Sequence, residues 1–294
     1  MLNTTSARLG ALASFVIMTA SGPSFAGTEC RAASAAVARP LVELYTSEGC
    51  DSCPPADRWL AGRFPAGDPG AGAVPLAFHV DYWDRLGWRD RFATPAYTAR
   101  QYEAMRENRS SFVYTPEVLV QGVAVRQWRE DAGRAIESAL RKPARATIGA
   151  DATVALHEVR LHVVVEVADA PDRRDAKVFA AYADNGLVSE IRSGENRGVR
   201  LVHAHVVRAL TDAGAVDAAG GLDAHVTLER PAEAGTDATI VVFVQRESNG
   251  DVLQALALPL GACAVRSVGA VEPRSGGLLA ARAQCTTCAS SPER

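Results

Sequence analysis

Short apolar runs alternate with helix-like segments along the first half of the chain. The runs are rich in β-branched or aromatic side chains, which is typical of buried strands, and a Thr-Pro pair marks one helix N-terminus. Strands are predicted at 40–46, 74–80, 118–121 and 123–126, and helices around Trp59-Leu60, from Thr94-Pro95 to Glu107, and over 129–140. A β-α-β unit followed by a hairpin and a helix is the order of a thioredoxin-like domain, which we place at residues 38–143.

The second half has a different pattern, in which apolar and polar side chains alternate. Such alternation predicts strands with one buried face, and Asn249-Gly250 is typical of a tight hairpin turn. The predicted strands are 159–167, 177–183, 201–210, 225–228, 240–245 and 252–258. We expect a β-sandwich at 144–266 and a loose tail at 267–294, rich in Gly, Ser and Ala. The predicted fold class is an α/β thioredoxin-like N-terminal domain plus a mostly antiparallel β-sandwich C-terminal domain.

The first 26 residues are typical of a secretory signal peptide. Arg8 is their only charged residue, an apolar run follows at 9–20, and Ser24-Phe25-Ala26 places small residues before a cleavage site. The apolar run is too short to cross a bilayer, and no lipoprotein-type motif surrounds Cys30. We expect cleavage near Ala26 and export to the periplasm or secretion, with no membrane anchor.

The composition is that of an ordinary globular protein. Of 294 residues, 48% are hydrophobic and 22% charged, and the net charge is −3. Because no basic patch stands out, nucleic acid is not predicted as a partner.

Six cysteines are present, and export makes disulfides the expected state. They are Cys30, Cys50, Cys53, Cys263, Cys285 and Cys288. If Cys50 and Cys53 pair with each other, the other four allow three connectivities. We favour a local Cys285–Cys288 loop and a Cys30–Cys263 link that holds the mature N-terminus.

Cys50 and Cys53 have C-x-x-C spacing between a predicted strand and a predicted helix. Free amides and the helix dipole favour a thiolate at such a position. Cys50 is therefore predicted as the nucleophile and Cys53 as the resolving thiol. A purely structural disulfide is the alternative, and a four-thiolate zinc site with Cys285 and Cys288 is disfavoured by export.

Neighbouring residues tune this pair. Glu48 and Asp51 place negative charge beside Cys50, and Pro54-Pro55 must lie in the first helical turn or delay the helix start. We therefore predict a less oxidising pair than that of strong oxidants. Glu43, on the incoming strand, is either a buried proton acceptor for Cys53 or simply an acid of the strand.

Two further segments are candidates for substrate contact. Thr115-Pro116 precedes the predicted hairpin, where a thioredoxin-like fold has a cis proline beside the disulfide. The predicted loop after residue 80 carries Tyr82, Trp83 and Trp88, which form either a substrate groove or a packed loop.

The histidines give weaker signals. His203 and His205 share one face of a predicted strand, but no third metal ligand is apparent, so solvated side chains are favoured over a metal pair. His79, at a strand end, is expected to be a hydrogen-bonded core residue.

Three segments carry a resemblance to a known family. They are residues 43–57, 78–88 and 114–118. Together they resemble a family of secreted bacterial proteins known as domain of unknown function 1223, over roughly residues 39–265. The resemblance implies a thioredoxin-like first domain and a β-rich second one, and no established activity. It carries over Cys50, Cys53 and Pro116, and leaves Cys285 and Cys288 outside its pattern.

Together these patterns predict an exported thiol–disulfide oxidoreductase. Its partners would be a protein thiol or disulfide substrate and a redox recycling partner, with no cofactor and no resident metal. The alternatives are a copper-delivery module that binds Cu(I) through Cys50 and Cys53, or a protein-binding module with a structural disulfide.

Overall fold

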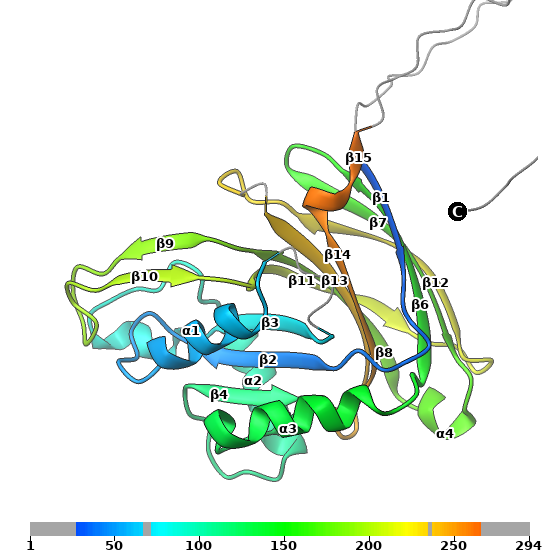
Figure 1. Ribbon diagram of the computed structural model, residues 1–294, viewed down its shortest axis with the longest axis horizontal. Helices are drawn as coiled ribbons and strands as arrows, with labels where there is room; N and C mark the ends of the chain where they lie inside the picture. Colours follow the sequence, from blue (N-terminus) through cyan, green and yellow to red (C-terminus); the bar gives the residue numbers. More distant parts are fainter. Residues whose placement is uncertain (1–27, 67–71, 235–236, 266–294) are drawn as a thin grey trace, which may run out of the picture. The chain divides into compact units, whose positions relative to one another are not determined.

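A computed structural model describes residues 28–66, 72–234 and 237–265 (Figure 1). The predicted signal peptide, the tail after residue 266 and the proposed Cys285–Cys288 pair lie outside the described residues. Among the helices that the structure describes, none is long and apolar enough to cross a bilayer.

The described elements follow one another in a β-rich order. The strands are β1 (Thr28–Ala33), β2 (Leu41–Thr46), β3 (Val74–His79), β4 (Glu117–Val120), β5 (Val123–Ala124), β6 (Ala146–Val154), β7 (Glu158–Val167), β8 (Ala176–Asp184), β9 (Leu187–Glu190), β10 (Arg200–His203), β11 (Val206–Ala215), β12 (Gly221–Glu229), β13 (Ala238–Arg246), β14 (Val252–Pro259) and β15 (Ala264–Val265). The helices are α1 (Pro54–Arg63), α2 (Pro95–Glu107), α3 (Trp128–Leu140) and the short α4 (Ala170–Arg173), with 3₁₀ helices η2 (Asp81–Leu86) and η3 (Leu260–Ala262).

One sheet of eight strands crosses both halves of the sequence. Its order is β14-β13-β8-β11-β3-β2-β4-β5. β2 pairs in parallel with β3, and β3 in turn pairs in parallel with β11 through Val206 and Ala77. The strands from the second half, β11, β8, β13 and β14, continue the sheet in antiparallel order.

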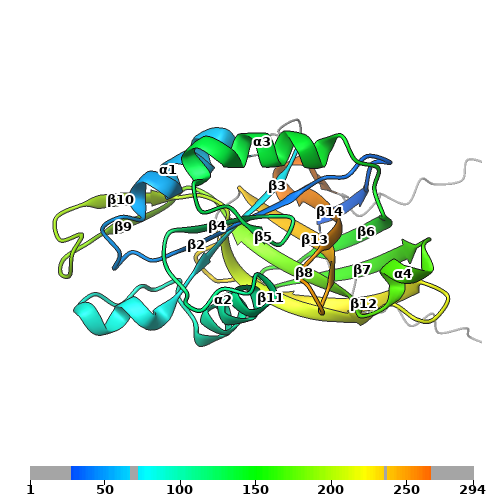
Figure 2. The same ribbon diagram turned by 90° about the horizontal axis from the view of Figure 1, so that it is seen from below.

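The helices cover the two faces of the first-half strands. Val42 and Leu44 of β2 pack with α1 and α3, while Leu41 and Tyr45 face the side of α2. Figure 2 shows α1 and α3 on one side of these strands and α2 on the other. Since successive strand residues point to opposite faces, a strand covered on both faces is largely apolar, and a charged residue within it, such as Glu43, needs a buried partner.

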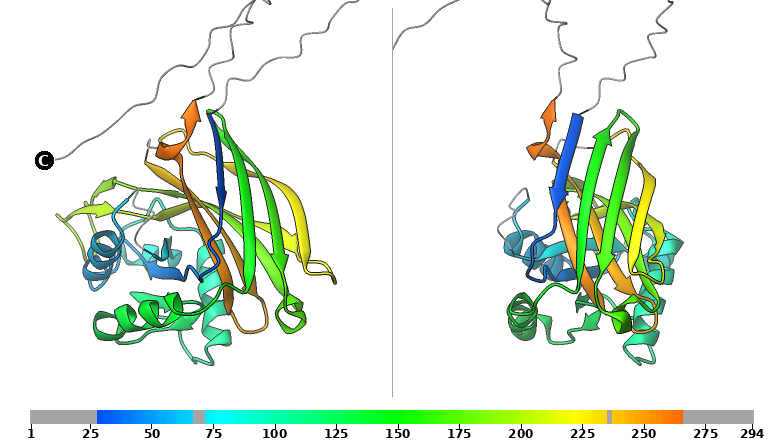
Figure 3. Two further views of the ribbon diagram at one scale, coloured as in Figure 1. Left: turned by 45° about the vertical axis from the view of Figure 1, so that its right-hand side comes forward. Right: turned by 90° about the vertical axis from the view of Figure 1, so that its right-hand side faces the viewer.

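A second sheet has the order β12-β7-β6-β1-β15. Figure 3 shows β1, β6, β7 and β12 side by side. Its inner side chains, such as Ile148 and Val163, pack against Tyr182 and Ile240 of the eight-stranded sheet. The Cys30–Cys263 disulfide ties β1 to the segment just before β15. This pairing is the one that the sequence favoured.

The predicted fold class is wrong: the described residues form no thioredoxin-like domain followed by a separate sandwich. Phe78 and Tyr97 share a core cluster with Val241 and Phe243, and the described residues fall in one compact unit. The Arg100 guanidinium lies over the ring of Phe78 from the first half and over those of Phe179 and Phe243 from the second half. The cause is β11, which pairs with β3 and so merges the two predicted domains into one sheet.

One close approach also joins the halves at their turns. Gly122, between β4 and β5, has φ +77°, and a Cβ atom there would lie 2.0 Å from the carbonyl oxygen of Gly250 in the β13–β14 turn. Only glycine fits this position, because it needs both a positive φ and the space of a missing side chain.

Candidate functional site

The Cys50–Cys53 disulfide lies in the turn between β2 and α1. The Cα atoms are 5.4 Å apart, and Cys53 is the N-cap of α1, accepting a hydrogen bond from the Ala56 amide at 2.8 Å. Both cysteines are fully buried, whereas Asp51 and Ser52 between them are exposed. Pro54 and Pro55 occupy the first helical turn, where their missing N–H groups would be unpaired anyway.

Behind the disulfide loop lies a group of buried polar side chains. We call Glu48, His79, Asp90 and His203 the buried polar cluster; each is at most 3% exposed. Such groups are rarely buried without a structural or chemical reason, because desolvation disfavours their charged forms.

Hydrogen bonds connect the members of this cluster. Glu48 accepts a hydrogen bond from Trp88 Nε1 at 2.7 Å, and its other oxygen lies 3.2 Å from His203 Nε2. The Glu48 amide donates to Asp90 Oδ2 at 2.9 Å, and His79 Nδ1 lies 2.6 Å from that oxygen. Glu48, two residues before the C-x-x-C motif, is thus the centre of a network of ionisable side chains.

The two imidazoles of the cluster face each other. Their ring centroids are 5.0 Å apart, and His79 Nε2 and His203 Nδ1 have no hydrogen-bond partner among the described residues. Burial alone would lower the pKa of His79, but Asp90 outweighs it, so this pKa is raised. The pKa of Asp90 is lowered, because the His79 charge and hydrogen bond overcome the opposite effect of burial.

Asp57 brings a further carboxyl group to this region. It lies on α1 one turn after Cys53, and its amide donates to the Cys53 carbonyl oxygen at 3.2 Å. As a residue it is half-buried, yet desolvation of its carboxyl group raises its pKa against the opposing charges of His203 and His79. Asp57 thus places a carboxyl group with a raised pKa one helical turn after Cys53.

A segment from the second half of the chain covers the disulfide loop. It is the connection between β9 and β10, which form a small two-stranded sheet beside α1 (Figure 1). Asn196 donates to the carbonyl oxygens of Glu48 and Cys50, each at 2.9 Å. The Asp51 amide donates to Glu195 Oε2 at 3.3 Å. We call residues 191–199 the covering loop.

The aromatic residues after β3 pack against the same place. Trp83 Nε1 donates to Thr115 Oγ1 at 2.8 Å, and a Cβ atom on Gly49 would lie 3.1 Å from Trp83 Cβ. Tyr82 donates to Gln101 at 3.2 Å, and burial raises its pKa to about 12. The Thr115–Pro116 peptide bond is cis. The structure therefore brings the disulfide loop, the aromatic segment and Thr115 together.

Glu43 lies elsewhere. It shares the β2 face of Leu41 and Tyr45, opposite the face covered by α1, and forms an ion pair of 2.7 Å with Arg100. The acids on the cysteine side are instead Glu48 and Asp57. The sequence did hint at them, because both lie within a few residues of the C-x-x-C motif.

The prediction that His203 and His205 lie on one face of one strand is wrong. The predicted strand 201–210 divides into β10 and β11, with His205 between them at φ +58°. His203 contacts Glu48, whereas His205 Nε2 lies 2.7 Å from the Phe64 carbonyl oxygen. Burial lowers the pKa of His205. Both side chains are buried rather than solvated, contrary to the favoured prediction, and each makes a different contact.

The fold and the site together define a β-rich protein with a buried disulfide in a four-residue turn beside a cluster of ionisable side chains. The chain belongs to the family described as protein of unknown function (DUF1223), whose model matches residues 41–245.

Two solved structures are similar to this chain. A crystal structure of a protein from Agrobacterium tumefaciens is 27% identical, with a TM-score of 0.50, over 78% of this chain and 96% of that one. HBP35 of Porphyromonas gingivalis is 13% identical, with a TM-score of 0.55, over 84% of this chain and 81% of that one, a likeness of fold alone. No curated protein matches the sequence at a significant level.

Proposed function

We propose that this protein is an exported thiol–disulfide oxidoreductase that acts through Cys50 and Cys53. The observation that carries the proposal is the buried polar cluster and Asp57, gathered beside a disulfide at a helix N-terminus. Two disulfides among the described residues also favour an oxidising compartment.

A purely structural role would explain this arrangement poorly. The Cys50–Cys53 bond has a sequence separation of only 3, so it removes little chain entropy from the unfolded state. Four buried ionisable side chains add a desolvation cost that a structural cross-link does not require. Perturbed titratable groups concentrate at functional sites, which favours a chemical role for this one.

The proposed reaction has two steps. In the first, the reduced enzyme's Cys50 thiolate attacks a substrate disulfide, forming a mixed disulfide and releasing one substrate thiol. In the second, Cys53 passes its proton to Asp57 and attacks Cys50, which releases the second substrate thiol and restores the Cys50–Cys53 disulfide. The substrate gains two electrons and the cysteine pair loses two, so a thiol-donating recycling partner must reduce the pair again.

Access to Cys50 requires a local movement, because both sulfur atoms are covered in the oxidised state. The covering loop is held over Cys50 mainly through Asn196. A substrate chain that displaced this loop would meet Thr115, Tyr82, Trp83 and Trp88, which we propose as substrate contacts.

The charges around Cys50 also bear on the direction of the reaction. Glu48 and Asp51 disfavour the thiolate, and Pro54 and Pro55 remove two amide donors from the first turn of α1. A less stabilised thiolate makes the pair less oxidising, so we propose a reductant or isomerase rather than a strong oxidant.

The test compares wild type with Cys50→Ser, Asp57→Asn and the matched control Glu43→Gln. We expect insulin or glutathione-disulfide reduction by wild type, none by Cys50→Ser, and roughly 10²–10⁴-fold slower turnover by Asp57→Asn, the usual scale of acid–base catalysis. The Asp57 variant should also lose the pH dependence of the second step, whereas Glu43→Gln should keep it.

The reduction potential of Cys50–Cys53 is a second measurement, which tests the proposal even if insulin and glutathione disulfide are not substrates of this protein. A potential below about −300 mV together with no turnover would mean a structural disulfide and would end the enzyme proposal. Stoichiometric Cu(I) binding by the reduced protein, lost in Cys50→Ser and unaccompanied by turnover, would favour metal delivery instead.

A further inference from the structure

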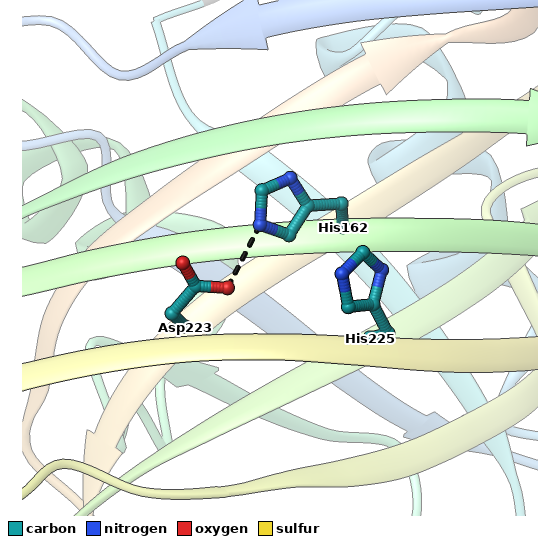
Figure 4. Close-up of side chains that lie close together, drawn as sticks. All are labelled: His162, Asp223 and His225. Carbon is teal, nitrogen blue, oxygen red and sulfur yellow. Dashed lines mark hydrogen bonds and ion pairs between the residues drawn. The ribbon is translucent and has the colours of Figure 1, made fainter.

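Two histidines and an aspartate meet on the outward face of the five-stranded sheet (Figure 4). His162 of β7 and His225 of β12 are direct cross-strand partners. Their rings stack with centroids 4.5 Å apart and an interplanar angle of 15°. Asp223, two residues before His225 on the same face of β12, places Oδ1 2.8 Å from His162 Nε2. This sheet does not contain the Cys50–Cys53 disulfide.

We propose that His162, Asp223 and His225 form a binding site for a divalent transition-metal ion of the zinc type. One ligand atom from each of the three residues lies within 4.8 Å of the others. Imidazole nitrogen and carboxylate oxygen are both zinc ligands, and a water molecule would complete a tetrahedral set. The chemistry of these donors fits Zn²⁺ better than Ca²⁺ or Mg²⁺, which take oxygen ligands.

The strand geometry lets the three groups close on an ion. In a tetrahedral site with bonds of about 2.0–2.1 Å, two ligand atoms lie about 3.4 Å apart, so the side chains must rotate to bring their ligand atoms together. The two stacked imidazoles must also leave their parallel arrangement, because each nitrogen lone pair lies in its own ring plane. Partial exposure leaves room for these rotations on the solvent side, since the His162 side chain is 34% exposed and that of Asp223 71%. The backbone is fixed, since β7 and β12 pair continuously from Gly221–Glu166 to Glu229–Glu158.

The positive charges around the site are paired with acids: Arg160, two residues before His162 on the same face of β7, forms an ion pair with Glu158. Asp151 of β6 lies directly opposite His162 on its other side, so a second carboxylate flanks the imidazole pair. Arg31 of β1 lies directly opposite Asp151 on the next strand, and the two side chains form an ion pair. Because β12 is the edge strand of this sheet, a bound ion would also fasten the edge to its neighbour.

The experiment is a competition titration of the full oxidised protein with Zn²⁺ and a chromophoric chelator. All variants carry Cys285→Ser/Cys288→Ser, which we call the background protein, because cysteine thiols at these positions could bind Zn²⁺ themselves. We expect one saturable site in this background. His162→Ala and His225→Ala should each weaken it by at least about tenfold, the lower end of the effect of perturbing a zinc site.

His157→Ala is the matched control, because His157 is an exposed histidine in the turn between β6 and β7, outside the cluster. It should bind Zn²⁺ as the background protein does. A second readout is the thermal unfolding midpoint, which Zn²⁺ should raise in the background and in His157→Ala but not in His225→Ala.

The proposal is overturned if the background protein shows no saturable zinc site. It is overturned equally if His162→Ala and His225→Ala bind Zn²⁺ as tightly as His157→Ala does. The substitutions lie at solvent-facing positions, so circular dichroism should show all variants folded.

Discussion

The two disulfides of this protein make the same bond in opposite settings. Cys30–Cys263 joins residues 233 positions apart, and its sulfurs lie at an apolar cluster between the two large sheets. Cys50–Cys53 joins residues 3 positions apart and lies beside Glu48, Asp57 and two histidines. In the chain-entropy model the first bond stabilises the fold by about 5 kcal/mol and the second by about 2 kcal/mol.

The difference teaches where to look for chemistry. The long-range disulfide connects β1 to the segment just before β15, and its surroundings need no charge. The short-range disulfide contributes less to stability, yet buried ionisable side chains lie beside it and the covering loop packs over it. Stability explains the first bond, and the second needs another explanation.

The largest expected effect comes from removing the long-range bond. Cys30→Ser/Cys263→Ser should lower the free energy of unfolding by about 5 kcal/mol, because the unfolded chain regains the entropy of a very large loop. Urea unfolding measures this change. The same variant should keep the thiol turnover proposed for Cys50 and Cys53. A loss of stability under about 1 kcal/mol would contradict the comparison.

A smaller effect is expected at the covering loop. Asn196→Ala removes two hydrogen bonds to buried carbonyl oxygens, which should cost about 2–3 kcal/mol. Reduction of Cys50–Cys53 by a small dithiol should also become faster, because the loop then opens more often.

Asn185→Ala is the matched control for that experiment. Asn185 also makes buried hydrogen bonds, to His205 and Asp237, and none of them involves the disulfide loop. It should cost similar stability without changing the rate of Cys50–Cys53 reduction. Equal rates in the two variants would show that the covering loop does not control access.

The smallest stability effect should follow loss of the short-range bond. Cys50→Ser/Cys53→Ser should cost about 2 kcal/mol, because only a small loop is released in the unfolded state. Urea unfolding tests the stability, and insulin reduction should be abolished at the same time. If this variant were destabilised more than the Cys30–Cys263 variant, Cys50–Cys53 would have to be regarded as the main structural link.

Local patterns predicted elements where each strand or helix carries its own strong signal. β2, β3, α2, α3, β13 and β14 all begin and end within a few residues of their predicted bounds. β1 and β6 were missed, because Thr28–Ala33 and Ala146–Val154 are rich in Ala, Gly and polar residues with little β-branched apolar character. They form strands because neighbours in the sheet supply their hydrogen bonds, which overrides weak propensity.

The same limit applies to the site. The C-x-x-C pair, its strand-to-helix setting and the nearby Thr115-Pro116 are sequence features, and so are the acids at positions 48 and 57. Asn196 and His203 are more than 140 positions from the disulfide loop that they cover or adjoin, and no local pattern pointed to them. Glu43 was a candidate proton acceptor because it lies on the strand that leads to Cys50. Its side chain points to the α2 face of β2, because successive strand residues alternate between faces, and there it pairs with Arg100.

By itself the sequence determined the thiol pair and most of the strands and helices, because these follow from spacing and periodicity within short windows. It left three connectivities open for the other four cysteines. The tertiary structure alone decided that the two halves share one sheet and that a buried polar cluster lies behind Cys50. The physical reason is that the pairing of β11 with β3 through Val206 and Ala77 joins strands far apart in the chain. Such a pairing is selected by the burial of the whole molecule rather than by the residues of either strand.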